Sequence, residues 1–187
     1  MATNSKYKIF QTENQEDILS AGFLPKQTNL VIGIDPAKEH PSFCQLTPEG
    51  DLVRFGWVNL KAYDLWLLLF RISKHVFIED QYFSITNKAT QYSVKAIIRA
   101  TGKLEQMAYI KTCSIRYVQA KTWQSKLLQG GNLPKKELKK LSLQEANKFL
   151  ETFKMPPITD NNLADAINIA RWAIKYKIKN KRASSKK

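Results

Sequence analysis

Cysteine and histidine are scarce in this chain, which has two of each among 187 residues. Cys44 and Cys113 lie far apart in the sequence, and neither belongs to a CxxC motif or lies near a pair of histidines. The sequence therefore indicates neither a disulfide framework nor a zinc site. Because His40 and His75 are the only histidines, a histidine-based metal site is not indicated either. Any metal is expected to have oxygen ligands.

Long apolar runs are also lacking. The most apolar window, Leu65–Phe70, is far shorter than the roughly 20 residues that a membrane-spanning helix needs. The first residues lack the basic and apolar regions of a secretory signal, and Glu13, Glu16 and Asp17 argue against a transit peptide. We therefore expect no membrane association and a cytoplasmic location.

Acidic residues are outnumbered, with 16 Asp and Glu against 30 Lys and Arg and a net charge of +14. A positive field of this size attracts phosphate polymers and makes binding depend on salt. Generic solubility and adhesion to anionic membranes are the alternatives. Nucleic acid is favoured because the lysines fall near aromatic and amide side chains, and no basic amphipathic helix with a bulky apolar face is evident.

The length and the hydrophobic content of 43% are typical of one globular domain. Residues 1–28 are polar and weakly patterned, so we treat them as an extension, and the pattern does not decide whether they fold back as a strand or a helix. Residues 29–179 are expected to form the domain. Residues 180–187 are expected to form a basic tail.

Strand and helix patterns alternate along the domain. The run Leu30–Ile34 predicts a strand buried on both faces, in which Gly33 lets another backbone approach closely. Asn59 is a candidate N-cap for the first helix. The other predicted strands are Ser42–Leu46, Leu52–Val58, His75–Ile78 and Ser114–Gln119, and the predicted helices are Asn59–Ile72, Asn87–Ile110, Lys121–Leu128, Leu133–Phe153 and one from about Asp160 to Ile178. The order βββαβαβα indicates an α/β fold with a mixed five-stranded sheet flanked by helices.

Three acids stand at the boundaries of these elements: Asp35 after the first strand, Glu79 after the fourth, and Asp165 in the first turns of the last helix. Taken singly, each has a structural explanation, as a turn former, a solvent-exposed strand end or a partner of the helix dipole. Ionised acids beside apolar strands cost free energy unless they are compensated. If the first and fourth strands are parallel neighbours, their ends adjoin. The acids then form an oxygen-rich site suited to Mg²⁺ and to phosphoryl transfer.

Three motifs support this interpretation. GIDP (Gly33–Pro36), FIEDQ (Phe77–Gln81) and NLADAINIA (Asn162–Ala170) resemble segments of the RuvC-type Holliday-junction resolvases of the RNase H-like superfamily. The resemblance extends over about Leu30–Lys175. The IE-x-Q form and the segment VQAKTWQSKLL (Val118–Leu128) are more similar to the phage, poxvirus and mitochondrial branches than to the bacterial branch.

The resemblance implies an RNase H-like sheet and a crossover junction endodeoxyribonuclease. Such an enzyme resolves four-way DNA junctions by paired symmetric nicks in recombination, repair or phage genome processing, and it acts as a homodimer. The resemblance is also compatible with a phage-encoded protein that acts in the host cytoplasm. The long helix predicted at residues 87–110 is our candidate for the dimer interface.

The resemblance also implies that Asp35, Glu79 and Asp165 are metal-binding catalytic acids that hold two Mg²⁺ ions, with Mn²⁺ as an alternative. The family has an acid or histidine three residues before the last acid, where this sequence has Asn162. Residues i and i+3 share a helix face, so the Asn162 amide oxygen is a candidate fourth ligand. Asp160 and Asp80 are the other candidates.

Expected DNA contacts follow from the same resemblance. Gln81, Tyr82 and Phe83 follow Glu79, where the family has an aromatic residue that contacts bases at the junction centre. We expect one of the two aromatic rings to pack under the following helix instead. The expected phosphate contacts are Lys121, Lys126, Lys139 and Lys140, each with a solvated surface charge as the alternative. Two other functions stay open: an RNase H-like nuclease for RNA–DNA hybrids or other branched DNA, and a noncatalytic nucleic-acid-binding module.

Overall fold

A mixed sheet forms the centre of the protein. The computed structural model describes residues 9–10, 29–80, 88–129 and 133–178, and its strands follow the order β1-β4-β3-β2-β5-β6. The strands are β1 (Ile9–Phe10), β2 (Leu30–Asp35), β3 (Ser42–Leu46), β4 (Leu52–Trp57), β5 (Ser73–Asp80) and β6 (Ser114–Gln119). β2, β3 and β4 form an antiparallel meander, whereas β2, β5 and β6 run parallel. All five predicted strands are present, and β1 adds a two-residue strand from the extension, parallel to β4.

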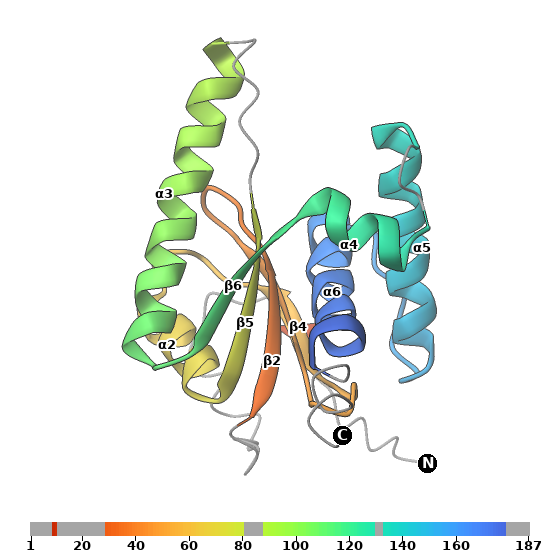
Figure 1. Cartoon of the computed structure of the whole chain (residues 1–187), viewed down its shortest axis with the longest axis horizontal. Helices are drawn as coiled ribbons and strands as arrows, with labels where there is room; N and C mark the ends of the chain where they lie inside the picture. The colour runs from red at the N-terminus through yellow and green to blue at the C-terminus, as the bar shows by residue number, and fades with distance from the viewer. Residues whose placement is uncertain (1–8, 11–28, 81–87, 130–132, 179–187) are drawn as a thin grey trace, which may run out of the picture.

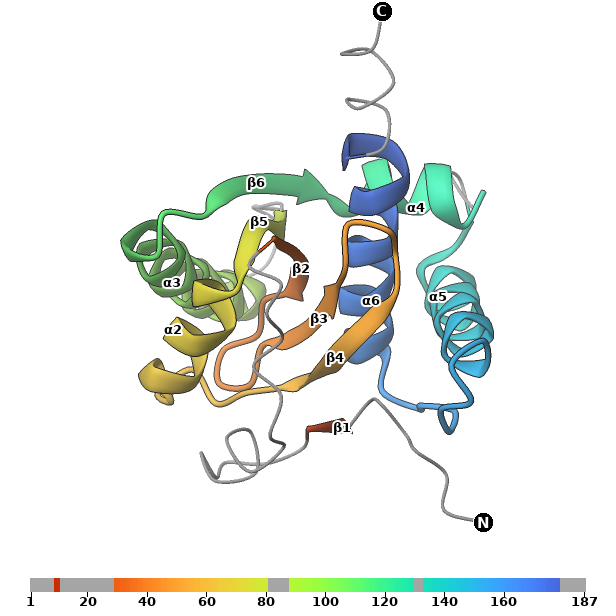
Figure 2. The same cartoon turned by 90° about the horizontal axis from the view of Figure 1, so that it is seen from below.

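Helices cover both faces of the sheet (Figures 1 and 2). They are α2 (Tyr63–Arg71), α3 (Lys88–Ile110), α4 (Ala120–Leu127), α5 (Lys135–Glu151) and α6 (Asn161–Ala173), and α6 continues into a π-helical segment, Ile174–Ile178. α2 and α3 lie on one face, while α6 lies on the other with α5 packed outside it. Among the described residues, no helix combines the length and the apolarity that a membrane crossing requires.

The central strand β2 contributes to two separate cores. Val31 packs in the core on the α6 side, together with Phe77 and Trp172. Ile32 and Ile34 pack in the core on the side of α2 and α3. Because side chains alternate along a strand, a run of apolar residues fills both cores. The prediction of a strand buried on both faces is confirmed.

The starts of α6 and α2 are capped differently. Asp160 caps α6, since its carboxylate accepts hydrogen bonds from the backbone N–H groups of Asn162 (2.7 Å) and Leu163 (3.2 Å). Asn59 does not cap α2, which begins at Tyr63 and has no side-chain cap. Its amide oxygen instead accepts a hydrogen bond from the backbone N–H of Lys61 (2.8 Å). The prediction was wrong because Asn59 closes a turn that precedes the helix.

Gly33 lets α6 lie directly on β2. A Cβ atom at this position would stand 2.5 Å from the backbone nitrogen of Ala170 and 2.7 Å from the carbonyl oxygen of Ala166. The predicted close approach of another backbone is therefore confirmed, and that backbone belongs to α6. The contact fixes α6 beside β2, so that residues at the start of α6 reach the end of β2.

Candidate active site

Strand register brings the first two acids together. β2 and β5 are parallel neighbours, and Ile34 pairs with Ile78. The next residue in each strand is an acid, Asp35 in β2 and Glu79 in β5. Both carboxylates therefore project from the carboxyl edge of the sheet, Asp35 buried with 9% of its surface exposed and Glu79 half-buried. The prediction that the ends of these two strands adjoin is confirmed.

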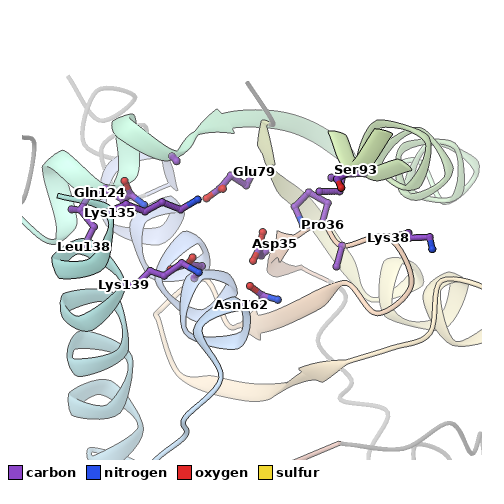
Figure 3. Close-up of a pocket in the computed structure, with 14 residues that line it drawn as sticks. Asp35, Pro36, Lys38, Glu79, Ser93, Gln124, Lys135, Leu138, Lys139 and Asn162 are labelled. Atoms are coloured by element: carbon purple, nitrogen blue, oxygen red, sulfur yellow. The ribbon is translucent and has the colours of Figure 1, made fainter. Parts of the chain in front are cut away.

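The amino-terminal part of α6 supplies the remaining acid. Asp165 and Asn162 are three residues apart on α6, so they share a face of the helix. Both line a cleft of about 580 Å³ that Asp35 and Glu79 also line. In Figure 3, Asp35, Glu79 and Asn162 surround this cleft. The three predicted catalytic acids thus lie at one site, although they come from three distant parts of the chain.

Three more helices complete the walls of the cleft. α3 contributes Ser93 and Ile97, α4 contributes Ala120 and Gln124, and α5 contributes Lys135, Leu138 and Lys139. Lys135 and Lys139 extend from α5 toward the acids (Figure 3). The cleft therefore combines carboxylates at its floor with ammonium groups on one wall. Such a wall attracts the phosphates of a nucleic acid.

Burial and mutual repulsion dominate the electrostatics of the acids. The pKa of Asp35 is raised well above its usual value, first by burial and then by the charges of Glu79 and Asp165. Burial raises the pKa of Asp165 to about 6, against the opposing effects of a hydrogen bond from Ser142 and the charge of Lys139. Because burial is the first cause of both shifts, ionising these acids in the cleft costs free energy. A divalent cation would offset that cost.

Two buried donors orient the carboxylates. The indole N–H of Trp123, in α4, donates a 2.8 Å hydrogen bond to Glu79 Oε2. The Ser142 hydroxyl, in α5, donates to Asp165 Oδ1. Trp123 and Ser142 are almost fully buried. They fix carboxylate oxygens of Glu79 and Asp165 without adding charge to the site.

Ser142 is itself held by a chain of polar contacts between α5 and α6. The amide nitrogen of buried Asn168 donates to the Ser142 hydroxyl (3.0 Å) and to the Ser142 carbonyl (2.8 Å). Arg171 donates to Asn168 Oδ1 (2.9 Å) and to the Glu145 carbonyl (2.9 Å). Because Asn168 occupies one lone pair of the hydroxyl, the Ser142 proton is directed to Asp165. Neither Ser142 nor Asn168 was predicted as a functional residue, since both contacts span more than 20 residues of sequence.

The donor set suits a hard cation. Asp35, Glu79, Asp165 and Asn162 offer carboxylate and amide oxygens, the ligands that Mg²⁺ prefers. Within the described ranges, no three Asp, Glu, His or Cys side chains form a ready-made metal cluster. Of the candidates for the fourth ligand, only Asn162 lines the cleft. Asp160 caps α6, and Asp80 is exposed next to Glu79 in β5, where adjacent side chains point to opposite faces.

The predicted DNA-contacting lysines do not all lie at the cleft. Lys139 lines the cleft, and so does Lys135, which the sequence analysis did not select. Lys126 lies instead over the ring of Tyr176, with 5.6 Å between its ammonium nitrogen and the ring centroid. Lys121 and Lys140 are exposed and do not line the cleft. Gln81, Tyr82 and Phe83 fall outside the described residues.

Removing the Ser142 hydroxyl should make Asp165 a weaker acid. In Ser142→Ala we expect the pKa of Asp165 to rise above its value of about 6, because the hydrogen bond from Ser142 lowers it. An NMR titration of the carboxyl carbon in metal-free protein measures this change. Ser125→Ala removes an exposed hydroxyl in α4 that bonds a backbone carbonyl and is the control. An unchanged Asp165 pKa in Ser142→Ala would contradict the assigned contact.

The metal-free protein should lose stability as the pH rises from about 4 to about 6. Asp165 has a pKa of about 6 in the fold and 3.8 as a reference, so the folded state binds its proton more tightly than the unfolded state. Its contribution is fully present below about pH 4 and is lost as the pH rises through 6, a change of about 3 kcal/mol. Urea unfolding with chelator across this range measures the slope. Asp165→Asn should reduce the slope of stability against pH. An equal slope in Asp165→Asn and in the unchanged protein would exclude Asp165 as the cause of the pH dependence.

Comparison with solved structures shows which known proteins have a similar fold. The Thermus thermophilus RuvC structure in complex with a Holliday junction substrate aligns with a TM-score of 0.60 and 17% identity, over 81% of this chain and 96% of that chain. Another Thermus thermophilus RuvC structure gives a TM-score of 0.56 and 17% identity over 82% and 96% of the two chains. The yeast mitochondrial Holliday junction resolvase Ydc2 gives 0.53 and 13% over 91% and 90%. No protein-family model and no curated protein matches the sequence. The chain therefore has the fold of these proteins, which confirms the predicted α/β class and the RNase H-like sheet.

Proposed function

We propose that this protein is a divalent-metal-dependent DNA endonuclease that resolves four-way junctions. The observation that carries the proposal is the convergence of Asp35, Glu79 and Asp165 on one cleft, at the ends of two parallel strands and the start of α6. Two of the three carboxylates are held by buried neutral donors. An arrangement of acids with raised pKa values and oriented oxygens in a cleft is typical of a catalytic site.

The residues have distinct roles in this proposal. Asp35, Glu79 and Asp165, with the amide of Asn162, would hold Mg²⁺, or Mn²⁺ as the alternative, as two ions. Bound ions of this kind activate a water molecule and stabilise the leaving oxygen during phosphodiester hydrolysis. Lys139 favours the ionised form of both Asp35 and Asp165. Lys135 and Lys139 attract the scissile phosphate into the cleft.

The choice of branched DNA rests on charge and on the neighbours' substrates. The net charge of +14 favours a polyanionic partner. One neighbour was solved with a Holliday junction substrate, and another is a Holliday junction resolvase. Junction resolution by paired symmetric nicks requires two active sites, so we propose a homodimer. α3 is our candidate interface, because Tyr92, Ile98, Tyr109 and Ile110 on this helix are exposed.

A substrate panel tests the proposal. A labelled four-way junction, a linear duplex and an RNA–DNA hybrid are incubated with Mg²⁺, with Mn²⁺ and with chelator. We expect paired nicks in the junction that leave 5′-phosphate and 3′-hydroxyl ends, dependence on metal, and little cutting of the duplex. Cleavage of the hybrid alone would favour the RNase H-like alternative. Binding of every substrate without cleavage under any metal condition would favour a noncatalytic module.

A further inference from the structure

The opposite edge of the sheet carries a second, positively charged pocket. Its volume is about 240 Å³, and its lining residues are Asn29, Pro48, Lys74, His75, Arg116, Lys177 and Ile178. Asn29 precedes β2, Lys74 and His75 lie near the start of β5, and Arg116 lies in β6. The pocket therefore lies near the amino ends of the three parallel strands. Figure 1 shows these strand ends at the lower end of the sheet.

This pocket is separate from the candidate active site. His75 lines the pocket and Glu79 lines the cleft, and the two residues are four positions apart in β5. At a rise of about 3.3 Å per residue, the two positions are roughly 13 Å apart along the strand. A ligand bound beside His75 would therefore not touch the acids.

Two of the cations are held in place by buried aromatic rings. The Arg116 guanidinium lies 5.8 Å from the centroid of Phe77, and the Lys177 ammonium lies 5.4 Å from the centroid of Trp172. Phe77 and Trp172 pack edge to face, with their centroids 6.2 Å apart. One aromatic pair thus supports cations from β6 and from the π-helical segment. Cation–π contacts of this kind restrict the head groups, which reduces the entropy lost when a ligand binds.

Among the described residues, no acid neutralises the charge of this pocket. Lys74, Arg116 and Lys177 are cationic, and no acidic residue is among the described residues that line the pocket. Within the same part of the chain, no carboxylate forms an ion pair with Arg116 or Lys177. Arg116 and Lys177 are half-buried, so their charges are less solvated than those of typical surface residues. An anion would compensate them.

We infer that this pocket binds a phosphate group. The planar guanidinium of Arg116 offers paired N–H donors that match two oxygens of a phosphate, and the two lysines add point charges. Asn29 adds a side-chain amide, which has N–H groups that can donate to the same anion. The phosphate belongs either to free phosphate or pyrophosphate, or to a DNA backbone. The inference does not depend on the nuclease function, because none of these residues lines the cleft.

A titration at constant ionic strength tests this site. Inorganic phosphate, pyrophosphate and a short DNA duplex are added separately to the metal-free full chain while backbone amide shifts are recorded by NMR. We expect saturable shifts at Lys74, His75 and Arg116 with at least one probe and none at Asp35 with the free anions. Lys177→Gln and Arg116→Gln should each weaken that binding about tenfold, the equivalent of one charge-assisted contact.

Control variants and the choice of probe distinguish the possible results of this titration. Lys103→Gln removes an exposed charge on α3, outside the pocket, and should leave the affinity unchanged. Lys74→Gln changes an exposed side chain and provides a test if Arg116→Gln fails to fold. Response to the free anions identifies a small-anion site, and response to DNA alone identifies a backbone-phosphate contact; both support a phosphate site. The inference would be overturned if Lys103→Gln lost as much affinity as Arg116→Gln, or if sodium chloride alone produced the same amide shifts.

Discussion

Asp35→Asn should abolish cleavage of a four-way junction while junction binding is retained. The amide has nearly the shape of the carboxylate but lacks the charge that a divalent ion requires. We expect the rate to fall by roughly three orders of magnitude or more, because the proposed metal site would lose a central ligand. Single-turnover cleavage and a binding titration on the same junction measure the two effects separately.

The same substitution should stabilise the metal-free protein. Burial and the charges of Glu79 and Asp165 raise the pKa of Asp35, so the ionised form costs free energy in the fold at neutral pH. Asparagine removes that cost. We expect a higher Tm for Asp35→Asn than for the unchanged protein in chelator at pH 7, and a smaller rise in Tm when Mg²⁺ is added.

A matched substitution defines the control. Asp51→Asn changes an exposed acid in the turn between β3 and β4, at the opposite edge of the sheet from the cleft. It should alter neither cleavage nor the response to Mg²⁺. If Asp35→Asn cuts junctions at the unchanged rate, the cleft is not the catalytic site. Loss of junction binding with an intact fold would instead show that Asp35 contributes to binding the substrate.

The strands and two acid positions could be predicted because their signals are local. An apolar run defines β2, and β6 has the predicted bounds, Ser114–Gln119. The sequence analysis placed Asp35 and Glu79 together on the condition that β2 and β5 are parallel neighbours, and the strands meet that condition. Asp165 was expected there from the resemblance of the NLADAINIA segment, and the close packing of α6 on β2 at Gly33 brings it there. Local pattern and topology therefore determine the floor of the cleft.

The supporting contacts could not be predicted because they depend on packing between distant segments. The hydrogen bond from Trp123 to Glu79 spans 44 residues of sequence, and a tryptophan in an amphipathic helix is typical of a core residue. The orientation of α5 decides that Lys135 lines the cleft and Lys140 does not. β1 has only two residues, too few to produce a periodic signal.

Gly33→Ala should destabilise the protein strongly. The added methyl group would stand 2.5 Å from the nitrogen and 2.9 Å from the Cα of Ala170, and 2.7 Å from the carbonyl oxygen of Ala166. These are backbone atoms of α6, so no side-chain rotation relieves the overlap, and the helix must move off the sheet. We expect a loss of about 3 kcal/mol or more in the free energy of unfolding. Urea unfolding at fixed pH measures it.

The displacement should also reach the active site, because Asp165 lies on the helix that must move. Junction cleavage by the folded fraction of Gly33→Ala should therefore fall as well. Gly102→Ala is the matched control, since a Cβ at Gly102 in α3 would meet no atom within 4 Å. It should stabilise the protein by up to about 1 kcal/mol through the helix propensity of alanine. The same substitution should therefore change the stability in opposite directions at the two glycines.

Equal stability of Gly33→Ala and Gly102→Ala would show that α6 does not rest on β2 at this distance. The position of Asp165 beside Asp35 would then lose its physical basis.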